Sequence, residues 1–299
     1  MEAARAARRE FPLRVPRSFV ARMRKRDPSD PLLRQVLPLG AELEAQPGFT
    51  HDAVGDLTSR AAPGVLHKYH GRVLLIASGA CAVNCRYCFR RHFPYAEESA
   101  RTDSWQPALQ YIRSDASLSE VILSGGDPLS LNDRTLADLV ARLQEIPQLR
   151  TLRIHTRQPI VLPSRVDAAL LSWLGNCRLR KVVVVHVNHA RELNAEVTDA
   201  LAKLHDAGAT LLNQSVLLRG VNDSAEALAE LSQQLFTAGV IPYYLHMLDR
   251  VSGAAHYDVP DSQAREIARG LRARLPGYLV PRLVREIPGA PAKMPVSAF

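Results

Sequence analysis

The chain has 299 residues, of which 46% are hydrophobic and 23% are charged. These proportions are typical of a globular protein and exclude a disordered or fibrous chain. No uninterrupted apolar stretch reaches the roughly 20 residues that a membrane helix needs, so we expect a soluble, cytoplasmic protein. Four cysteines are too few for a disulfide scaffold.

The positive charge of the chain is concentrated at its N-terminus. Residues 1–26 hold nine arginines and lysines and two glutamates, which accounts for +7 of the net charge of +8. This segment lacks the apolar region of a secretory signal, and a solvated basic helix or arm is its simplest interpretation. An acidic or nucleic-acid partner for the segment stays open, although we expect no direct nucleic-acid binding by the protein as a whole.

Residues 1–66 are rich in proline and predict an N-terminal extension of helices and loops. From residue 72 onward, short apolar runs alternate with amphipathic stretches, which predicts strand–helix units and a parallel sheet. The predicted strands are 73–77, 120–123, 149–154, 181–186, 210–216 and 241–247. The predicted helices are 104–115, 132–146, 166–175, 192–207, 223–238 and 261–273, with capping signals at Thr102 or Ser104 and at Asn132.

Six such units predict an α/β fold, a partial or full (β/α)6-type barrel. The run of four valines at 182–185 is apolar on both faces, as a buried parallel strand requires. We expect the barrel core to span residues 67–275 and a C-terminal segment to span residues 276–299. Functional side chains should lie at the C-terminal ends of the strands.

Three cysteines, Cys81, Cys85 and Cys88, follow directly after the first predicted strand of the barrel. Three thiolates on one loop can bind three irons of a 4Fe-4S cluster and leave the fourth iron open. Zinc is the alternative, but a closed zinc site needs four ligands, usually two pairs. The remaining cysteine, Cys177, ends a predicted helix and has no partner cysteine nearby, so the spacing favours the cluster.

The CxxxCxxC spacing, with Tyr87 before the last cysteine, resembles the signature of radical S-adenosylmethionine (SAM) enzymes. The segment 89–93, Phe-Arg-Arg-His-Phe, narrows the resemblance to the lysine 2,3-aminomutase branch. It covers most of 60–295 and continues through the segments 123–129, 186–189, 213–223 and 242–244. The resemblance implies a partial radical SAM barrel with a 4Fe-4S cluster on the three cysteines.

The same resemblance implies a set of side chains and glycines beside SAM. The segment 125–127, Gly-Gly-Asp, resembles the motif that binds the SAM amine, and Tyr87 matches the aromatic residue against adenine. Taken alone, a glycine pair would indicate an ordinary turn, and a lone His or Gln a satisfied polar residue. The positions expected near SAM are Tyr87, Gly125, Gly126, Asp127, His186 and Gln214.

Relatives in this branch carry pyridoxal phosphate (PLP) as a Schiff base on a lysine, which here matches Lys293. A Schiff base needs a primary amine, which arginine cannot supply. Two glycines of the family motif are replaced by alanine and proline, and Lys293 taken alone would indicate a frayed tail. Lys68, Tyr69 and Arg72 match the segment expected around the PLP phosphate, although alone they would suit an exposed basic surface.

The resemblance also implies how lysine is bound at its two ends. Arg90 matches the arginine on the substrate α-carboxylate, which a guanidinium can bind with two hydrogen bonds. Asp249 and Glu286 match acids expected on the ε-ammonium, and Glu286 is one methylene longer than the usual aspartate. Ser224 stands where clostridial-type relatives have a zinc-binding cysteine, so we expect no zinc site of that kind.

The resemblance therefore predicts an isomerase that converts L-α-lysine into β-lysine with a cluster, SAM and PLP. The form without zinc ligands, with glutamate at position 286, resembles the branch that makes (R)-β-lysine for elongation factor P, with a functional link to its ligase. We expect a reductant protein of flavodoxin or ferredoxin type. A catabolic lysine aminomutase, a non-catalytic metal-binding module and, more weakly, a glutamate aminomutase remain as alternatives.

Overall fold

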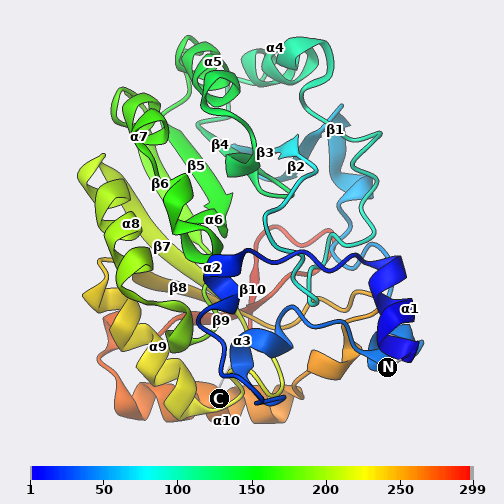
Figure 1. The fold of residues 1–299 in the computed structure, drawn as a ribbon. Coiled ribbons are helices and arrows are strands. Elements are labelled where there is room, and N and C mark those ends of the chain that lie inside the picture. The colour runs from blue at the N-terminus through cyan, green and yellow to red at the C-terminus, as the bar shows by residue number, and fades with distance from the viewer. Residues whose placement is uncertain (1, 297–299) are drawn as a thin grey trace.

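The computed structural model describes residues 2–296 (Figure 1). Its central feature is a single ten-stranded sheet whose strands lie side by side in chain order. The strands are β1 (Arg60–Ala62), β2 (Val65–Tyr69), β3 (Arg72–Ser78), β4 (Glu120–Gly125), β5 (Thr151–Thr156), β6 (Arg180–Val185), β7 (Ala209–Val216), β8 (Ile241–His246), β9 (Arg282–Arg285) and β10 (Met294–Pro295).

The strands from β3 to β9 are parallel, and those at the two edges of the sheet are antiparallel. In the parallel part, Val121 of β4 lies opposite Val73 of β3 and Leu152 of β5. Within residues 2–296 the two edges of the sheet do not pair with each other, so the barrel is open. The six predicted strands correspond to β3–β8, and the prediction of a partial barrel is confirmed.

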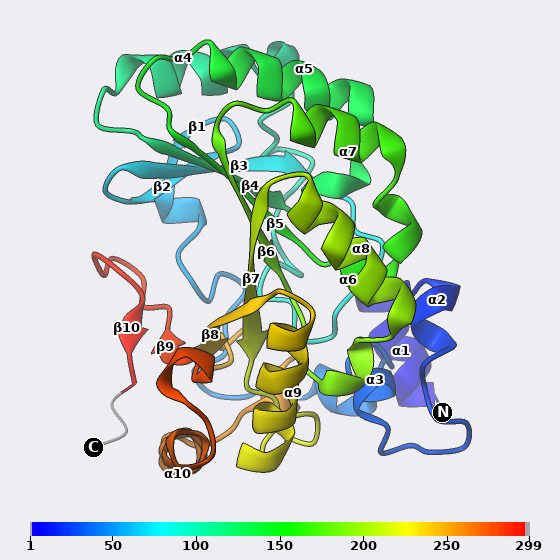
Figure 2. The same ribbon diagram turned by 90° about the vertical axis from the view of Figure 1, so that its left-hand side faces the viewer.

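Helices cover the outer face of the curved sheet, as Figure 2 shows. They follow the strands because each parallel connection must cross from one end of the sheet to the other. The six predicted helices are confirmed, and α6 is an additional short one. The outer helices are α4 (Gln106–Ser114), α5 (Asp133–Gln144), α6 (Gln158–Val161), α7 (Ala168–Gly175), α8 (Ala195–Asp206), α9 (Ala225–Thr237) and α10 (Asp261–Arg274).

The main hydrophobic core lies between the sheet and these helices. Helix α5 buries Leu136, Leu139 and Leu143, whose spacing places them on one face. Its predicted cap is confirmed, because the Asn132 side chain accepts from a backbone N–H in the first turn. The capping signal predicted before α4 is wrong: the helix follows Trp105, which has a φ of 71° and makes no side-chain capping bond.

Four strands were not predicted from the sequence, namely β1, β2, β9 and β10. They have two to five residues each, too few for a periodic apolar pattern, and they form through pairing with neighbouring strands. The sheet continues across both expected segment boundaries, between residues 66 and 67 and between residues 275 and 276. The division into an extension, a barrel core and a C-terminal segment therefore stays a prediction. Helices in the described part of the chain are too short or too polar to span a membrane.

The N-terminal extension contains α1 (Glu2–Glu10), α2 (Arg17–Val20) and α3 (Pro31–Arg34), and it packs on the loop after β3. We call residues 79–88 of that loop the cysteine loop. Phe19 and Leu32 of the extension are fully buried against Val83 of the cysteine loop. Arg86, also fully buried, forms an ion pair with Glu42 of the extension. The extension is therefore part of the wall around the three cysteines.

Two glycines after β4 allow close contact between this turn and the cysteine loop. Gly125 has a φ of 117°, and a Cβ atom there would lie 2.5 Å from the backbone oxygen of Ser78. A Cβ atom on Gly126 would lie 2.5 Å from the backbone oxygen of Ala80. The Gly126 N–H donates to Ser78 O at 2.6 Å. The glycine pair thus allows a close approach to the protein's own backbone.

We expect Gly125→Ala to destabilise the protein by about 2 kcal/mol, because alanine strains the backbone and collides with a carbonyl oxygen. Urea unfolding of the protein should show a lower midpoint. Gly175→Ala is the matched control, since a Cβ atom there meets nothing within 4 Å at the end of α7. Equal midpoints for the two variants would contradict the argument.

Candidate active site

The three cysteines lie on one loop at the C-terminal end of the barrel, as half-buried free thiols. Within residues 2–296, no three His, Cys, Asp or Glu side chains are grouped as ligands of a single metal ion. Three thiols on one loop fit a 4Fe-4S cluster, which takes one thiolate for each of three irons.

A buried arginine lies against the cysteine loop. Arg157, which follows β5, donates to the Cys85 sulfur at 2.8 Å and to the Tyr87 hydroxyl at 2.6 Å. It also donates to Gln35 Oε1 at 2.6 Å and forms an ion pair with Glu192 at 2.9 Å. Gln35 belongs to the N-terminal extension, so this network joins the extension, the barrel and the cysteine loop.

Asp127 is buried, and its carboxylate is fully used within the protein. It accepts hydrogen bonds from the N–H groups of Leu129, Arg157 and Gln158 and from the hydroxyl of Thr156, at 2.8–3.2 Å. Burial raises the pKa of Asp127, although these hydrogen bonds oppose the rise. The side chain fixes the loop after β5 to the turn after β4, and this leaves the backbone of the turn as the part that can face a ligand.

His186 and Gln214 lie side by side at the ends of β6 and β7. Gln214 Nε2 lies 2.8 Å from His186 Nε2. Burial, with the charges of Arg157 and Arg90, lowers the pKa of His186 to about 3. The imidazole is therefore neutral at pH 7, and its Nε2 can accept a hydrogen bond from the Gln214 amide.

Two more histidines inside the barrel were not predicted as site residues. His155 and His246 are on β5 and β8, and burial lowers the pKa of each well below its usual value. In both rings, Nε2 is buried and has no hydrogen-bond partner among the described residues. Buried polar atoms are nearly always hydrogen-bonded, so these two nitrogens mark positions where a ligand atom can bind.

Five charged side chains of alternating sign form a series across the barrel mouth: Arg90, Asp56, Lys68, Glu286 and Lys293. Asp56 accepts from Arg90 Nε at 2.6 Å and pairs with Lys68 Nζ at 2.7 Å. Glu286 lies 3.7 Å from Lys68 Nζ and 2.6 Å from Lys293 Nζ. Burial alone would raise the pKa of Asp56, but Arg90 and Lys68 hold it below its usual value.

The predicted PLP residues meet at the centre of this charge series. The Tyr69 hydroxyl donates to Glu286 Oε1 at 2.6 Å, and the Arg72 guanidinium lies over the Tyr69 ring. Lys293 Nζ lies 6.0 Å from the centre of the Tyr244 ring. The structure thus brings Lys293 together with two of the three residues predicted around the phosphate, Lys68 and Tyr69, through their shared contact with Glu286.

Asp249, which follows β8, is a half-buried acid beside this series. Burial raises the pKa of Asp249 to about 7, against the lowering effect of the Lys293 ammonium and with a further rise from Glu286. Among residues 2–296, its carboxylate has no ion-pair partner within 4.0 Å. An acid that is costly to ionise and lacks a close cation is suited to receive one from a ligand.

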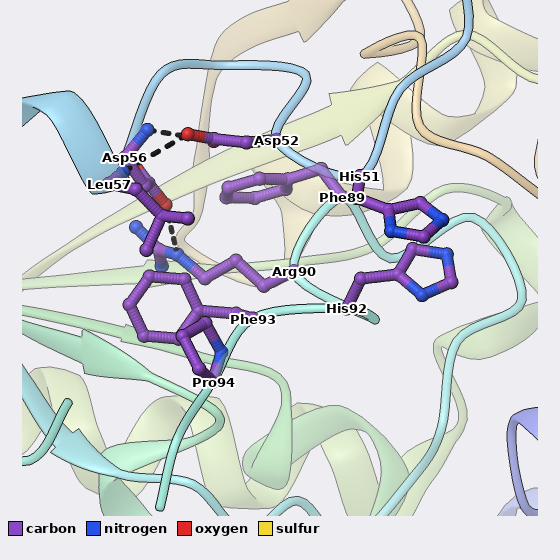
Figure 3. A pocket seen from close by; sticks show the side chains of 9 residues that line it. All are labelled: His51, Asp52, Asp56, Leu57, Phe89, Arg90, His92, Phe93 and Pro94. Carbon is purple, nitrogen blue, oxygen red and sulfur yellow. Dashed lines mark hydrogen bonds and ion pairs between the residues drawn. The ribbon is translucent and has the colours of Figure 1, made fainter. Parts of the chain in front are cut away.

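A pocket borders the Arg90 end of the charge series (Figure 3). In Figure 3 the Arg90 side chain points toward Asp56, with Phe89 and Phe93 on either side. Arg90 uses Nε for Asp56 and Nη1 for Ser124, at 2.6 Å and 3.2 Å. A guanidinium has five donor hydrogens, so it retains donors for a further carboxylate.

The sequence did not reveal Asp56 or Arg157 as site residues. Arg157 and His246 lie near the ends of predicted strands, which was the only signal available for them. Asp56 lies in a loop without a recognisable sequence pattern. Its partners, Lys68 and Arg90, are 12 and 34 positions away in the sequence. Cys177 lies in the main core, away from the cysteine loop.

Comparison with known proteins identifies the family of this chain. Residues 75–232 match the profile of the radical SAM superfamily. The L-lysine 2,3-aminomutase of Escherichia coli (strain K12) is 53% identical over 294 residues, which cover 98% of this chain and 86% of that protein. The L-lysine 2,3-aminomutase of Haemophilus influenzae is 48% identical over 288 residues, 96% of this chain and 85% of that protein.

A solved radical SAM methyltransferase from Sphaerobacter thermophilus is 17% identical, with a TM-score of 0.49 over 74% of this chain and 68% of that one. The assignment rests on the family profile and the sequence relatives. By both criteria, this chain belongs to the radical SAM superfamily and, within it, to the L-lysine 2,3-aminomutase family of isomerases.

Proposed function

We propose that this protein converts L-α-lysine into β-lysine with PLP as a further cofactor. As a member of the radical SAM lysine 2,3-aminomutase family, it is an isomerase that uses a 4Fe-4S cluster and SAM. The observation that carries the proposal is the charge series. Arg90 is the cation at one end, and the primary amine of Lys293 is at the other end, with two acids, Glu286 and Asp249, nearby. This arrangement matches the charges of lysine and the amine that PLP requires.

The donor sets support the cofactor assignments. In the proposal, Cys81, Cys85 and Cys88 bind the cluster, and SAM lies against Tyr87, His186, Gln214 and the backbone at Gly125–Asp127. Lys293 holds PLP, and Lys68, Tyr69 and Arg72 bind its phosphate. When bound, the cluster with SAM supplies the radical that removes hydrogen, and PLP carries the amino group between carbons.

The protein's own part is to hold lysine at both ends and exclude water from its centre. Arg90 binds the α-carboxylate with the donors that Asp56 and Ser124 leave unused. Asp249 and Glu286 bind the ε-ammonium, which would cost several kcal/mol to bury without a partner. Acids at this end oppose a substrate with a side-chain carboxylate, which argues against a glutamate aminomutase.

The finer proposal is that the product is (R)-β-lysine for elongation factor P, made in the cytoplasm with electrons from a flavodoxin- or ferredoxin-type protein. The glutamate at position 286 supports this branch. So does Ser224, whose hydroxyl accepts from the N–H of Ala227 and caps α9, a structural role in place of a metal ligand. A catabolic free-lysine role is tested by the stereochemistry of the product.

The decisive experiment is anaerobic purification, cluster reconstitution and chiral chromatography after incubation with lysine, SAM, PLP and dithionite. We expect (R)-β-lysine, dependent on every component. Cys85→Ala should lose iron, acid-labile sulfide and SAM cleavage, and the matched Cys177→Ala should retain all three. Absence of β-lysine from a protein with a full cluster would contradict the proposed function.

Lys293→Ala should abolish covalent PLP attachment and leave iron content unchanged. After borohydride reduction, peptide mapping of the wild type should locate the PLP label on Lys293. Lys203→Ala, which changes an exposed lysine of α8, should label like the wild type. A label on Lys68 would reverse the two lysine assignments.

We expect kcat/KM for lysine to fall about tenfold per pH unit below pH 7. The pKa of Asp249, about 7, lies far below that of the substrate ammonium, so acidification removes the carboxylate and leaves the cation unchanged. Asp249→Asn should have a low kcat/KM that does not fall further below pH 7. It should load PLP normally. If kcat/KM of Asp249→Asn fell in the same way below pH 7, the titrating group would be a residue other than Asp249.

Asp56→Asn should lower kcat/KM for lysine by roughly 100-fold, because it leaves two buried cations without their shared carboxylate. The loss should appear mainly in KM, since Asp56 orients Arg90 and does not touch the reacting atoms. Asp138→Asn, which disrupts an exposed ion pair on α5, is the control and should change little. An unchanged KM in Asp56→Asn would show that Arg90 does not depend on Asp56.

A further inference from the structure

The basic N-terminal segment has no role in the site described above. Within residues 2–26, the side chains of Arg5, Arg8, Arg9, Arg14 and Arg17 are exposed. We call these five residues the basic face. None of them has an ion-pair partner within 4.0 Å in the described part of the chain. Because the rest of the sequence is near neutral, this face is the main concentration of positive charge in the protein.

Helix α1 presents its arginines outward because its alanines pack inward. Ala7 is fully buried, and a Cβ atom on Gly40 would lie 2.8 Å from Ala3, so this side contacts the helix at Gly40–Leu43. Arg5 and Arg9 lie on the opposite side, one turn apart. Like charges at this spacing repel each other, and an acidic partner relieves that repulsion.

Helix stability accounts for only part of the basic face. Arg8 and Arg9 are at the C-terminal end of α1, where positive charge is favourable. Arg5, Arg14 and Arg17 lie outside that last turn and gain nothing from it. Helix α1 itself lies against the cysteine loop, because Arg86 of that loop donates to the backbone oxygen of Ala7 at 3.3 Å.

The segment after α1 is hydrogen-bonded along the cysteine loop. Arg14 donates through Nη1 to the backbone oxygen of Cys81 at 2.9 Å, and the Asn84 N–H donates to Arg14 O at 2.9 Å. Arg86, between two of the cysteines, donates to the backbone oxygen of Phe11 at 2.6 Å. The basic face is therefore fixed to the same loop that holds the proposed cluster ligands.

We propose that the basic face docks an acidic one-electron carrier protein that reduces the cluster. This inference rests on the proposed function, in which the cluster must be in its reduced state when SAM is cleaved. One electron passes from the reduced carrier to the cluster; the carrier is oxidised by one electron, and no atom or proton is transferred. Charge complementarity at such a face raises the association rate and fixes the orientation of the carrier.

The test combines Arg5→Gln, Arg8→Gln and Arg9→Gln, because glutamine keeps the helix and removes the charge. The matched control combines Arg150→Gln, Arg178→Gln and Arg180→Gln, three exposed arginines near the N-terminal ends of β5 and β6. Calorimetry measures the Kd of a purified acidic bacterial flavodoxin for each cluster-loaded protein at low and high salt. Anaerobic stopped-flow measures cluster reduction by that flavodoxin or by dithionite.

For the α1 variant we expect a Kd at least tenfold higher at low salt and a smaller salt dependence, with flavodoxin-driven reduction slowed to match. Reduction and lysine turnover with dithionite should equal those of the wild type, and the control variant should bind flavodoxin normally. Failure of the wild type to form β-lysine with dithionite would refute the proposed function separately.

Three results would overturn the docking proposal. The first is an unchanged Kd in the α1 variant. The second is equal weakening in both variants, which would indicate a general effect of net charge. The third is selective loss of binding to a labelled RNA oligonucleotide with flavodoxin binding intact, which would assign the basic face to nucleic acid.

Discussion

Buried charges must be paired, and at the mouth of this barrel the pairing is made in series. Asp56 holds Arg90 and Lys68, and Glu286 holds Lys68 and Lys293, so each acid serves two cations. Removing any one member leaves its neighbours partly unpaired in a low-dielectric interior, at a cost of several kcal/mol. The cation proposed for the substrate carboxylate and the proposed PLP lysine are therefore positioned by the same two acids.

This arrangement has a consequence for ligand binding. If Lys293 holds PLP, its Nζ is no longer an ammonium paired with Glu286, and that carboxylate is left with Lys68 at 3.7 Å and the Tyr69 hydroxyl. Asp249 nearby already lacks a close cation. Under the proposed function, a substrate ammonium would then satisfy two acids at once. In the proposed function, cofactor loading and substrate binding would therefore be linked through one carboxylate.

The sequence predicted the parts of the molecule that depend on repeated or local patterns. Strands β3, β4 and β6 are largely apolar runs, and the three cysteines lie close together in the sequence on one loop. Asp249 and Glu286 lie at the same end of the sheet, because each follows one of two neighbouring parallel strands. Asp56 could not be predicted, because its position depends on a loop that folds back over the barrel mouth. The short edge strands likewise depend on partners far away in the chain.

The open side of the barrel explains why one carboxylate has so many contacts. Strand β2 lies near one edge of the sheet and β9 near the other, and these edges do not pair within the described residues. Glu286, directly after β9, reaches across to Lys68 and Tyr69 of β2. Side chains fill the interior of a closed eight-stranded barrel. Here polar contacts join the two edges where backbone pairing is absent. A glutamate, longer than aspartate by one methylene, is suited to reach from one edge to the other.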